Sequence, residues 1–404
     1  MKFENLKYLL KHFVEIGPTG CAISVSINGK TEYEQFEGYA NLEKTRPITQ
    51  NTLFRICSMS KVITVVGLLK LFEQGCFLMN DPISLYLPEF EHMKVYKTTG
   101  NGTISVEAAR RPITILNLLT MTSGLTYDAI VAPSLGNVKG RGIAVNPTEL
   151  EMKYTVEQLE EKGGYTLREF SKAISRVPLA FHPGEGWYYG YGIDIIGAII
   201  EVITRKNLGQ FLRDEIFHPL GMNSTYFFLP DNRKKDLAGV YVRENGIMKP
   251  NPTWDILYQK SHLFESGGGG ILCTLGDITR FSQMLSMNGN FDGKHIIGRK
   301  TVDMMRRNYL TPEQMKCFQE THENGWGFLK GYGYGLGVRT LVDPTKGGWN
   351  GTPGEFAWAG AAGTYMLIDP KEKLAICYMH QIRPNNMEEF CTPRIRNVVY
   401  GAID

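Results

Sequence analysis

The stretch Phe54-Arg55-Ile56-Cys57-Ser58-Met59-Ser60-Lys61 comes directly before an apolar run that extends from Val62 to Phe72. This run predicts a buried helix over residues 52–75. Because side chains three apart share one face of a helix, the Ser58 hydroxyl and the Lys61 amine are expected to be neighbours. A helix N-terminus and burial both disfavour a protonated lysine, and a neutral amine can turn a serine hydroxyl into a nucleophile.

The Ser-x-x-Lys pattern also has an ordinary structural explanation, in which Ser58 is a helix N-cap and Lys61 is a solvated lysine. Patterns with two fixed letters in four positions arise by chance in chains of this size. The four residues alone therefore do not decide between a nucleophile and a cap, and the rest of the sequence has to be considered.

The composition is that of an ordinary globular enzyme, with 404 residues, 43% hydrophobic and 21% charged. The 44 basic and 41 acidic residues nearly balance, which argues against a nucleic-acid partner. Seven scattered cysteines without CxxC pairs indicate reduced thiols and predict neither a disulfide framework nor a metal site. We also expect no signal peptide, no membrane helix, no cofactor and a cytoplasmic location.

Strand patterns occur towards both ends of the sequence. Residues 22–27 and 31–39 predict a hairpin turned at Asn28-Gly29, after a helix over 1–17. A second hairpin is predicted from residues 356–366 and 374–381, turned at Asp369-Pro370, and further strands at 241–242 and 335–341. A closing helix is expected over 394–403.

The middle of the sequence is dominated by helical patterns, and residues 129–153 read as a long surface loop that could border a cleft. The predicted helices cover 113–121, 167–177 and 193–204. The sequence therefore predicts an α/β (α+β) fold in which residues 1–89 and 241–404 form a sheet domain and residues 90–240 form an inserted, mostly helical domain. A cleft would lie at the junction, with Ser58 at its floor.

Four motifs, spread over nearly the whole chain, resemble the motifs of a known protein family. They are Ser58-Met59-Ser60-Lys61, the Ser123-Gly124-Leu125 turn after a predicted helix, Trp187-Tyr188-Tyr189-Gly190-Tyr191, and Trp358-Ala359-Gly360-Ala361. The sequence resembles the serine β-lactamase and penicillin-binding-protein-like family, and is most similar to class C β-lactamases and family VIII carboxylesterases. The resemblance implies a β-lactamase/transpeptidase-like fold, an antiparallel sheet flanked by helices with an inserted helical lobe.

The third motif identifies the family's tyrosine. Counting two residues on from Trp187 and eight back from Gly197 gives Tyr189, with Tyr188 as the alternative if the register shifts by one. Tyr189 could also be a packed aromatic side chain, since aromatic residues are frequent here. The family's asparagine after this tyrosine is absent, and Tyr191 stands in its place.

The fourth motif departs from the β-lactamase pattern Lys-Thr-Gly, because Trp358 stands where the lysine would be. A tryptophan cannot form an ion pair with a substrate carboxylate, but it offers a flat apolar wall. Trp358 could equally be plain core. Together with Tyr191, this departure favours a neutral, bulky acyl substrate and puts efficient β-lactam hydrolysis in doubt.

The resemblance also implies roles for the site residues. Ser58 would attack the carbonyl carbon, while Lys61 and Tyr189 would share its proton, and the sequence leaves open which of them is the base. The backbone N–H groups of Ser58 and Ala361 would form the oxyanion hole. Gly360 would let the acyl group approach the strand closely, and Tyr127 would either line the cleft or cap it.

These observations favour a serine hydrolase acting on a small-molecule ester, most simply a carboxylesterase. The alternatives are a β-lactamase, a D-amino-acid peptidase or amidase, an acyltransferase, and a non-catalytic sensor of acyl or peptidoglycan fragments. The expected lack of an export signal argues against a cell-wall enzyme. The glycine run from Gly267 to Gly270 reads as a bend beside the cleft, since no phosphate-binding pattern surrounds it.

Overall fold

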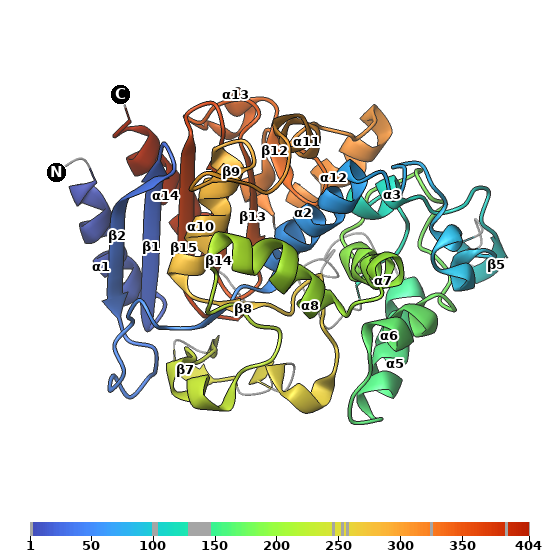
Figure 1. Ribbon diagram of the computed structural model, residues 1–404, viewed down its shortest axis with the longest axis horizontal. Helices are drawn as coiled ribbons and strands as arrows, with labels where there is room; N and C mark the ends of the chain where they lie inside the picture. Colours follow the sequence, from blue (N-terminus) through green and yellow to red (C-terminus); the bar gives the residue numbers. More distant parts are fainter. Residues whose placement is uncertain are drawn as a thin grey trace.

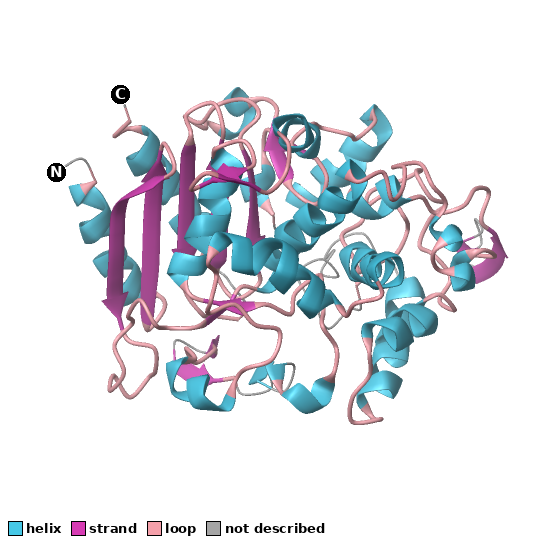
Figure 2. Ribbon diagram, viewed as in Figure 1, coloured by secondary structure: helices cyan, strands magenta, loops and turns pink. Residues whose placement is uncertain are grey.

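The main sheet of the protein has seven antiparallel strands in the computed structural model (Figures 1 and 2). The structure describes residues 3–98, 104–127, 147–244, 247–251, 254–255, 258–323, 326–383 and 387–403. The strand order is β11-β12-β13-β14-β15-β1-β2. The strands are β1 Gly20–Ile27, β2 Lys30–Gly38, β11 Tyr332–Tyr334, β12 Arg339–Leu341, β13 Phe356–Gly360, β14 Thr364–Asp369 and β15 Leu374–Met379.

Helices cover both faces of this sheet. Tyr365 and Leu367 on β14 belong to a core cluster shared with α1 (Glu4–Ile16) and α14 (Glu388–Tyr400). The alternate residues Met366 and Ile368 belong to the larger cluster on the opposite face, which includes α10 (Leu275–Ser286) and α2 (Ser60–Glu73). This alternation, with period two along a strand, is what a sheet buried on both faces requires.

The helical part of the chain lies beyond α2, on the right of Figure 1. There α7 packs against α2, α3 and α6, and α8 packs against α7. The helices are α3 Ile115–Leu119, α5 Pro147–Glu160, α6 Leu167–Ile174, α7 Gly192–Thr204, α8 Leu208–Leu212 and α9 His218–Leu220. Helix α2 packs against the helices of this part and shares a core cluster with the sheet. The Ser-x-x-Lys segment at its N-terminal end therefore lies where the sheet and the helical part meet.

Several sequence predictions are confirmed. The first helix and the hairpin of β1 and β2 are present, and the turn residues Asn28 and Gly29 have φ of 52° and 73°. Both values lie in the left-handed region that a two-residue hairpin turn needs. The predicted helices at 167–177 and 193–204 correspond to α6 and α7, and β15 pairs with β1, so the two ends of the chain share one sheet.

The predicted helix over residues 52–75 is wrong at its start. Phe54–Arg55 form a short strand, β3, which pairs with β8, Leu272–Cys273. A single 3₁₀ turn, Cys57–Met59, follows, and α2 begins only at Ser60. Pairing with a strand more than two hundred residues away overrides the local helical pattern, so Ser58 lies just before the helix.

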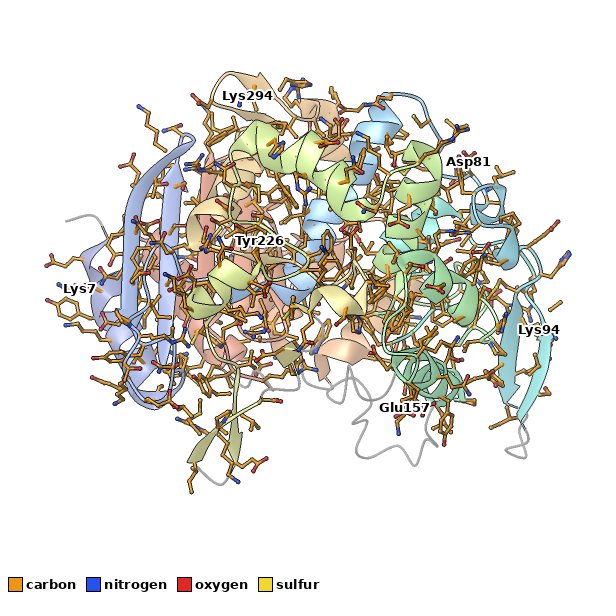
Figure 3. The ribbon with its side chains drawn as sticks, turned by 60° about the horizontal axis from the view of Figure 1, so that its bottom comes forward. Lys7, Asp81, Lys94, Glu157, Tyr226 and Lys294 are labelled. Carbon is orange, nitrogen blue, oxygen red and sulfur yellow. The ribbon has the colours of Figure 1, made fainter. Side chains whose placement is uncertain are left out.

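In the middle region the prediction missed a hairpin. Strands β4 (Lys94–Thr98) and β5 (Ile104–Ala108) pair at the end of the molecule opposite α1, as the labelled Lys94 and Lys7 show in Figure 3. The predicted loop at 129–153 is wrong for residues 147–153, which are the start of α5. The remainder of that loop lies outside the described residues.

The later strands are divided more finely than predicted. Residues 356–366 are not one strand, because a turn at 361–363 separates β13 from β14, and residues 335–341 contain only β12. Helix α14 begins at Glu388, six residues before the predicted 394. Further elements are β6 Tyr241–Glu244, β7 Ile247–Pro250, β9 Asn290–Phe291, β10 Lys294–His295, α11 Arg299–Met305, α12 Pro312–Glu323 and α13 Pro344–Gly347.

Strands β6 and β7 form a separate two-stranded sheet, so residues 241–242 do not belong to the main sheet, although Tyr241 forms an isolated bridge with Ile382. The domain boundaries at 89/90 and 240/241 stay a prediction. Within the described ranges, none of the helices has both the length and the apolar character needed to cross a membrane.

Candidate active site

The backbone before Ser58 is held in an unusual conformation. Cys57 has φ of 47°, in the left-handed region that a non-glycine residue adopts at a cost. The turn after β13 packs against this segment: the Thr364 hydroxyl donates to the Ile56 carbonyl at 3.0 Å. A Cβ on Gly360 would lie 2.4 Å from that carbonyl oxygen, so only glycine fits there. Ser58, which is partly exposed, follows in the 3₁₀ turn Cys57–Met59.

Lys61 is completely buried and lies in the first turn of α2. Its Nζ is 3.4 Å from Ser58 Oγ, 2.6 Å from the Tyr127 hydroxyl and 2.6 Å from the Gly268 carbonyl oxygen. The carbonyl can only accept a hydrogen bond, whereas the two hydroxyl groups can also donate. The structure therefore fixes the amine by one obligatory bond and leaves two groups that can exchange a proton with it.

Burial lowers the pKa of Lys61 to about 8, against the opposing influence of the Asp194 carboxylate and the Cys57 thiol. Removing water from around an ammonium favours the neutral amine. An amine with this pKa is partly deprotonated near neutral pH, which an exposed lysine is not.

Tyr189 also faces the amine, with Lys61 Nζ 4.8 Å from the centre of its ring, and its ring lies next to that of Tyr127 with centres 5.4 Å apart. The indole N–H of Trp358 donates to the Tyr189 hydroxyl at 2.9 Å. Burial raises the pKa of Tyr189 well above its ordinary value, although hydrogen bonds from Ser58 and Trp358 oppose the rise. Tyr189 is therefore a neutral phenol in this site.

The alternative tyrosine lies elsewhere, because the Tyr188 hydroxyl donates to Glu149 on α5. Of the predicted substrate-binding residues, Tyr127 contacts Lys61, and Tyr191 packs edge-on against Tyr127 with ring centres 4.5 Å apart. Trp358 is 3% exposed and stands behind Tyr189. The structure thus brings Ser58, Lys61, Tyr189, Tyr127, Tyr191, Trp358 and Gly360 into one neighbourhood.

Two residues at the site, Asp194 and Trp326, were missed by the sequence analysis, and the contact of Gly268 with Lys61 was not predicted although the glycine run was expected beside the cleft. Gly268 holds Lys61 through its carbonyl, Asp194 binds the same glycine from behind, and Trp326, which is partly exposed, packs edge-on against Tyr189. An acid within the strongly apolar stretch 193–204 was a usable signal for Asp194, since such an acid requires a partner. The contact partners of Gly268 and Trp326 leave no comparable signal in sequence spacing.

Across the ranges that the structure describes, His, Cys, Asp and Glu nowhere gather in groups of three that could hold an ion. Cys57, next to the nucleophile, is 4% exposed, and burial raises the pKa of its thiol. That environment keeps the thiol protonated and makes it a packing residue.

The family model described as Beta-lactamase matches residues 8–400 of the sequence. The chain belongs to the β-lactamase family. This assignment confirms the resemblance of the four motifs, and with it the β-lactamase/transpeptidase-like fold.

Two curated relatives of this β-lactamase-family chain are esterases. Esterase EstB of Burkholderia gladioli is 26% identical over 401 residues, which cover 95% of this chain and 91% of the relative. Lovastatin esterase of Penicillium rubens is 29% identical over 346 residues, covering 81% and 79%. Among solved structures, EstCE1, a hydrolase with promiscuous acyltransferase activity, has a TM-score of 0.78 at 22% identity and covers 99% of this chain and 98% of its own. The protein is a serine hydrolase of this family, which favours the enzyme over a sensor.

Proposed function

We propose that the protein is a carboxylesterase that forms an acyl-enzyme on Ser58 and acts on small-molecule esters with neutral, bulky acyl groups. The observation that carries the proposal is the position of the Lys61 amine, completely buried and 3.4 Å from the Ser58 hydroxyl oxygen. The esterase relatives support the same reaction class. A nucleophile with a base in hydrogen-bond reach, itself oriented by a third group, is the arrangement that acyl transfer needs.

In the first step, the neutral Lys61 amine takes the proton of Ser58 as Oγ bonds to the substrate carbonyl carbon. The lowered pKa of Lys61 and the raised pKa of Tyr189 support Lys61 as the base. The carbonyl oxygen becomes an oxyanion, which accepts hydrogen bonds from the backbone N–H groups of Ser58 and Ala361. Loss of one such donor costs about 10²- to 10³-fold in rate.

In the second step, the bond to the leaving oxygen breaks. Tyr189 accepts a hydrogen bond from Trp358, so its own O–H hydrogen is available to donate. Tyr189 protonates the leaving alkoxide and takes up the proton that Lys61 received. A water molecule then attacks the acyl-enzyme, passes its proton to Lys61, and releases the acid while Ser58 regains its proton.

The substrate class is inferred from what surrounds Ser58. Trp358 occupies the strand position where the β-lactamase pattern has a lysine, and it is buried behind Tyr189. Around Tyr189 and Lys61, the buried Tyr127 packs against Tyr191, and the partly exposed Trp326 packs edge-on against Tyr189. Aromatic walls favour apolar, uncharged groups. We therefore propose a neutral acyl ester and poor turnover of β-lactams, whose carboxylate would find no lysine on this strand.

The test uses a short-chain nitrophenyl ester, a chromogenic cephalosporin and a serine-directed phosphonate followed by mass spectrometry. We expect ester turnover, slow cephalosporin turnover and a single adduct on Ser58. Ser58→Ala should abolish both turnover and adduct, whereas the control Ser175→Ala should keep them, because Ser175 donates only to a backbone carbonyl on α6. Adding a primary alcohol as acyl acceptor distinguishes a transferase, in which ester product would exceed acid. Fast cephalosporin hydrolysis would overturn the proposal.

We propose a cytoplasmic location for the same enzyme. All seven cysteines lie within the described residues, none of them is in a disulfide, and five of them are buried. An oxidising compartment would favour disulfides, and thiols persist where glutathione and thioredoxin keep them reduced. Cell fractionation with an antibody against the protein would test this, and recovery in an extracytoplasmic fraction would contradict it.

A further inference from the structure

A buried acid lies behind the proposed base. Asp194 is 1% exposed and belongs to the first turn of α7, a helix whose other buried residues are all apolar. Its Oδ1 accepts hydrogen bonds from the Ser266 hydroxyl at 2.6 Å and from the Gly268 N–H at 3.0 Å. A carboxyl group this deeply buried is costly unless its charge is compensated, so its surroundings need an explanation.

Asp194 binds the glycine turn, which we define as residues 266–270. This turn lies between α7 and α2, and on the α2 side the Thr64 hydroxyl donates to Gly267 while the Lys61 amine donates to Gly268. A Cβ on Gly268 would lie 2.4 Å from Asp194 Oδ2, so the close approach requires glycine. A single residue, Gly268, thus connects the carboxylate at its N–H to the amine at its carbonyl.

Few titratable groups act on Lys61. Among the described residues these are the Asp194 carboxyl on α7, the Cys57 thiol before the nucleophile, and the Tyr127 and Tyr189 phenols that contact or face the amine. Burial raises the pKa of Cys57 and of Tyr189, which keeps both neutral. Burial also raises the pKa of Asp194, while the Lys61 charge, Ser266 and Gly268 oppose that rise and favour the carboxylate.

We propose that Asp194 is a positioning residue for the general base: it holds the glycine turn so that Gly268 accepts a hydrogen bond from Lys61, and its negative charge stabilises the ammonium that forms when Lys61 takes the proton of Ser58. This inference rests on the proposed function. The proton moves from Ser58 Oγ to Lys61 Nζ, and Asp194 neither gains nor loses one. In a buried site, a fixed negative charge stabilises a positive charge that develops nearby more strongly than it would in water.

The competing explanation is that Asp194 only secures a helix end and a turn. The chain offers a matched control for that role. Asp277 occupies the same position in the first turn of α10, is 8% exposed, and accepts hydrogen bonds from the Ser224 N–H and the Thr225 hydroxyl. It has the same kind of bonds as Asp194, but it belongs to a helix on the sheet and does not contact the glycine turn.

The experiment compares the pH profiles of ester hydrolysis by the wild type, Asp194→Asn and Asp277→Asn. Only neutral Lys61 can act as base, so wild-type kcat/KM should rise with pH through the pKa of about 8. Asparagine keeps an oxygen for Ser266 and Gly268 but removes the charge. Without that charge the ammonium is less stable, so the rising limb of Asp194→Asn should move to lower pH by about one unit. Its plateau kcat should also fall at least about tenfold. Asp277→Asn should leave the rising part of the pH profile of kcat/KM at the wild-type pH.

Three outcomes have distinct meanings. A folded Asp194→Asn enzyme with an unmoved limb would overturn the positioning role while leaving the proposed function standing. If Asp194→Asn does not fold, Ser266→Ala carries the test, because it removes one hydrogen bond that favours the carboxylate. Its limb should then move in the same direction by less, and an unmoved limb would again overturn the proposal. Absence of ester turnover and of a Ser58 adduct in the wild type would instead overturn the proposed function itself.

Discussion

Two buried sites in this protein each combine a cation, carboxyl groups and tyrosines, yet they are built differently. Near one end of the sheet, Arg396 and Glu355 are 2% and 0% exposed and form a direct ion pair. Tyr332 accepts a hydrogen bond from Arg396 at 2.9 Å and donates to Glu355 at 2.6 Å. At the proposed active site, Lys61 and Asp194 do not touch, because the Gly268 peptide lies between them.

The difference shows how the same groups produce either a structural pair or a reactive one. Burial alone would lower the pKa of Arg396, but Tyr332 and Glu355 raise it overall, so this cation keeps its proton at every accessible pH. With only an indirect carboxylate partner, burial prevails for Lys61 and lowers its pKa to about 8. Direct pairing fixes a charge, whereas separation by one peptide leaves the charge able to change.

The largest expected effect comes from making the active-site cation permanent. Lys61→Arg retains a positive charge and hydrogen-bond donors, but a guanidinium does not lose its proton and cannot accept the proton of Ser58. We expect kcat/KM for a nitrophenyl ester to fall by at least about 10³-fold. Lys70→Arg is the control on the same helix, because Lys70 pairs with Glu215 and lies away from Ser58. Substantial activity in Lys61→Arg would show that another group is the base.

The next effect is on stability and concerns the structural pair. Glu355→Gln leaves the Arg396 charge buried beside a neutral partner, and breaking such a pair costs about 3–5 kcal/mol. Urea unfolding should therefore show a much lower midpoint, while kcat per folded molecule stays near that of the wild type. Glu244→Gln is the control, because its pair with Lys249 is about half exposed on β6 and β7. An unchanged midpoint for Glu355→Gln would mean that the pair contributes nothing to folding.

The sequence predicted those parts of the fold that depend on neighbours along the chain. The turn at Asn28-Gly29 follows from two residues that tolerate positive φ, and the helix predicted over 193–204 from its apolar pattern is α7. The start of α2 could not be predicted in this way. Phe54–Arg55 pair with Leu272–Cys273, and this pairing depends on how the whole chain folds.

The same distinction applies to the site. The three-residue spacing of Ser58 and Lys61 was sufficient to predict that their side chains meet, and the motif count selected Tyr189 over Tyr188. The groups that tune Lys61 lie far away in sequence, since the Asp194–Gly268 contact spans 74 residues. Cys57, with its left-handed conformation, likewise follows Ile56, whose carbonyl lies against Gly360 at the end of β13, and no local pattern encodes that contact.

The smallest expected effect separates two roles for Trp358, a substrate wall, as its sequence position suggested, or a support for Tyr189. Trp358→Phe keeps an aromatic ring but removes the N–H that donates to the Tyr189 hydroxyl at 2.9 Å. A typical hydrogen bond contributes about 1 kcal/mol, so kcat should fall by about 2- to 10-fold. KM should stay constant, because a side chain that is 3% exposed has little surface to offer a substrate.

Trp187→Phe is the matched control for this measurement. Trp187 is equally buried and stacks on the same tyrosine with ring centres 6.5 Å apart, but its indole N–H has no hydrogen-bond partner within the described ranges. Both variants shrink an indole to a phenyl ring beside Tyr189, so any effect of the smaller ring should be common to both. A lower kcat in Trp358→Phe alone would assign the difference to the N–H bond. A raised KM with constant kcat would show that Trp358 contacts the substrate. In that case packing, and not the N–H bond, would orient Tyr189.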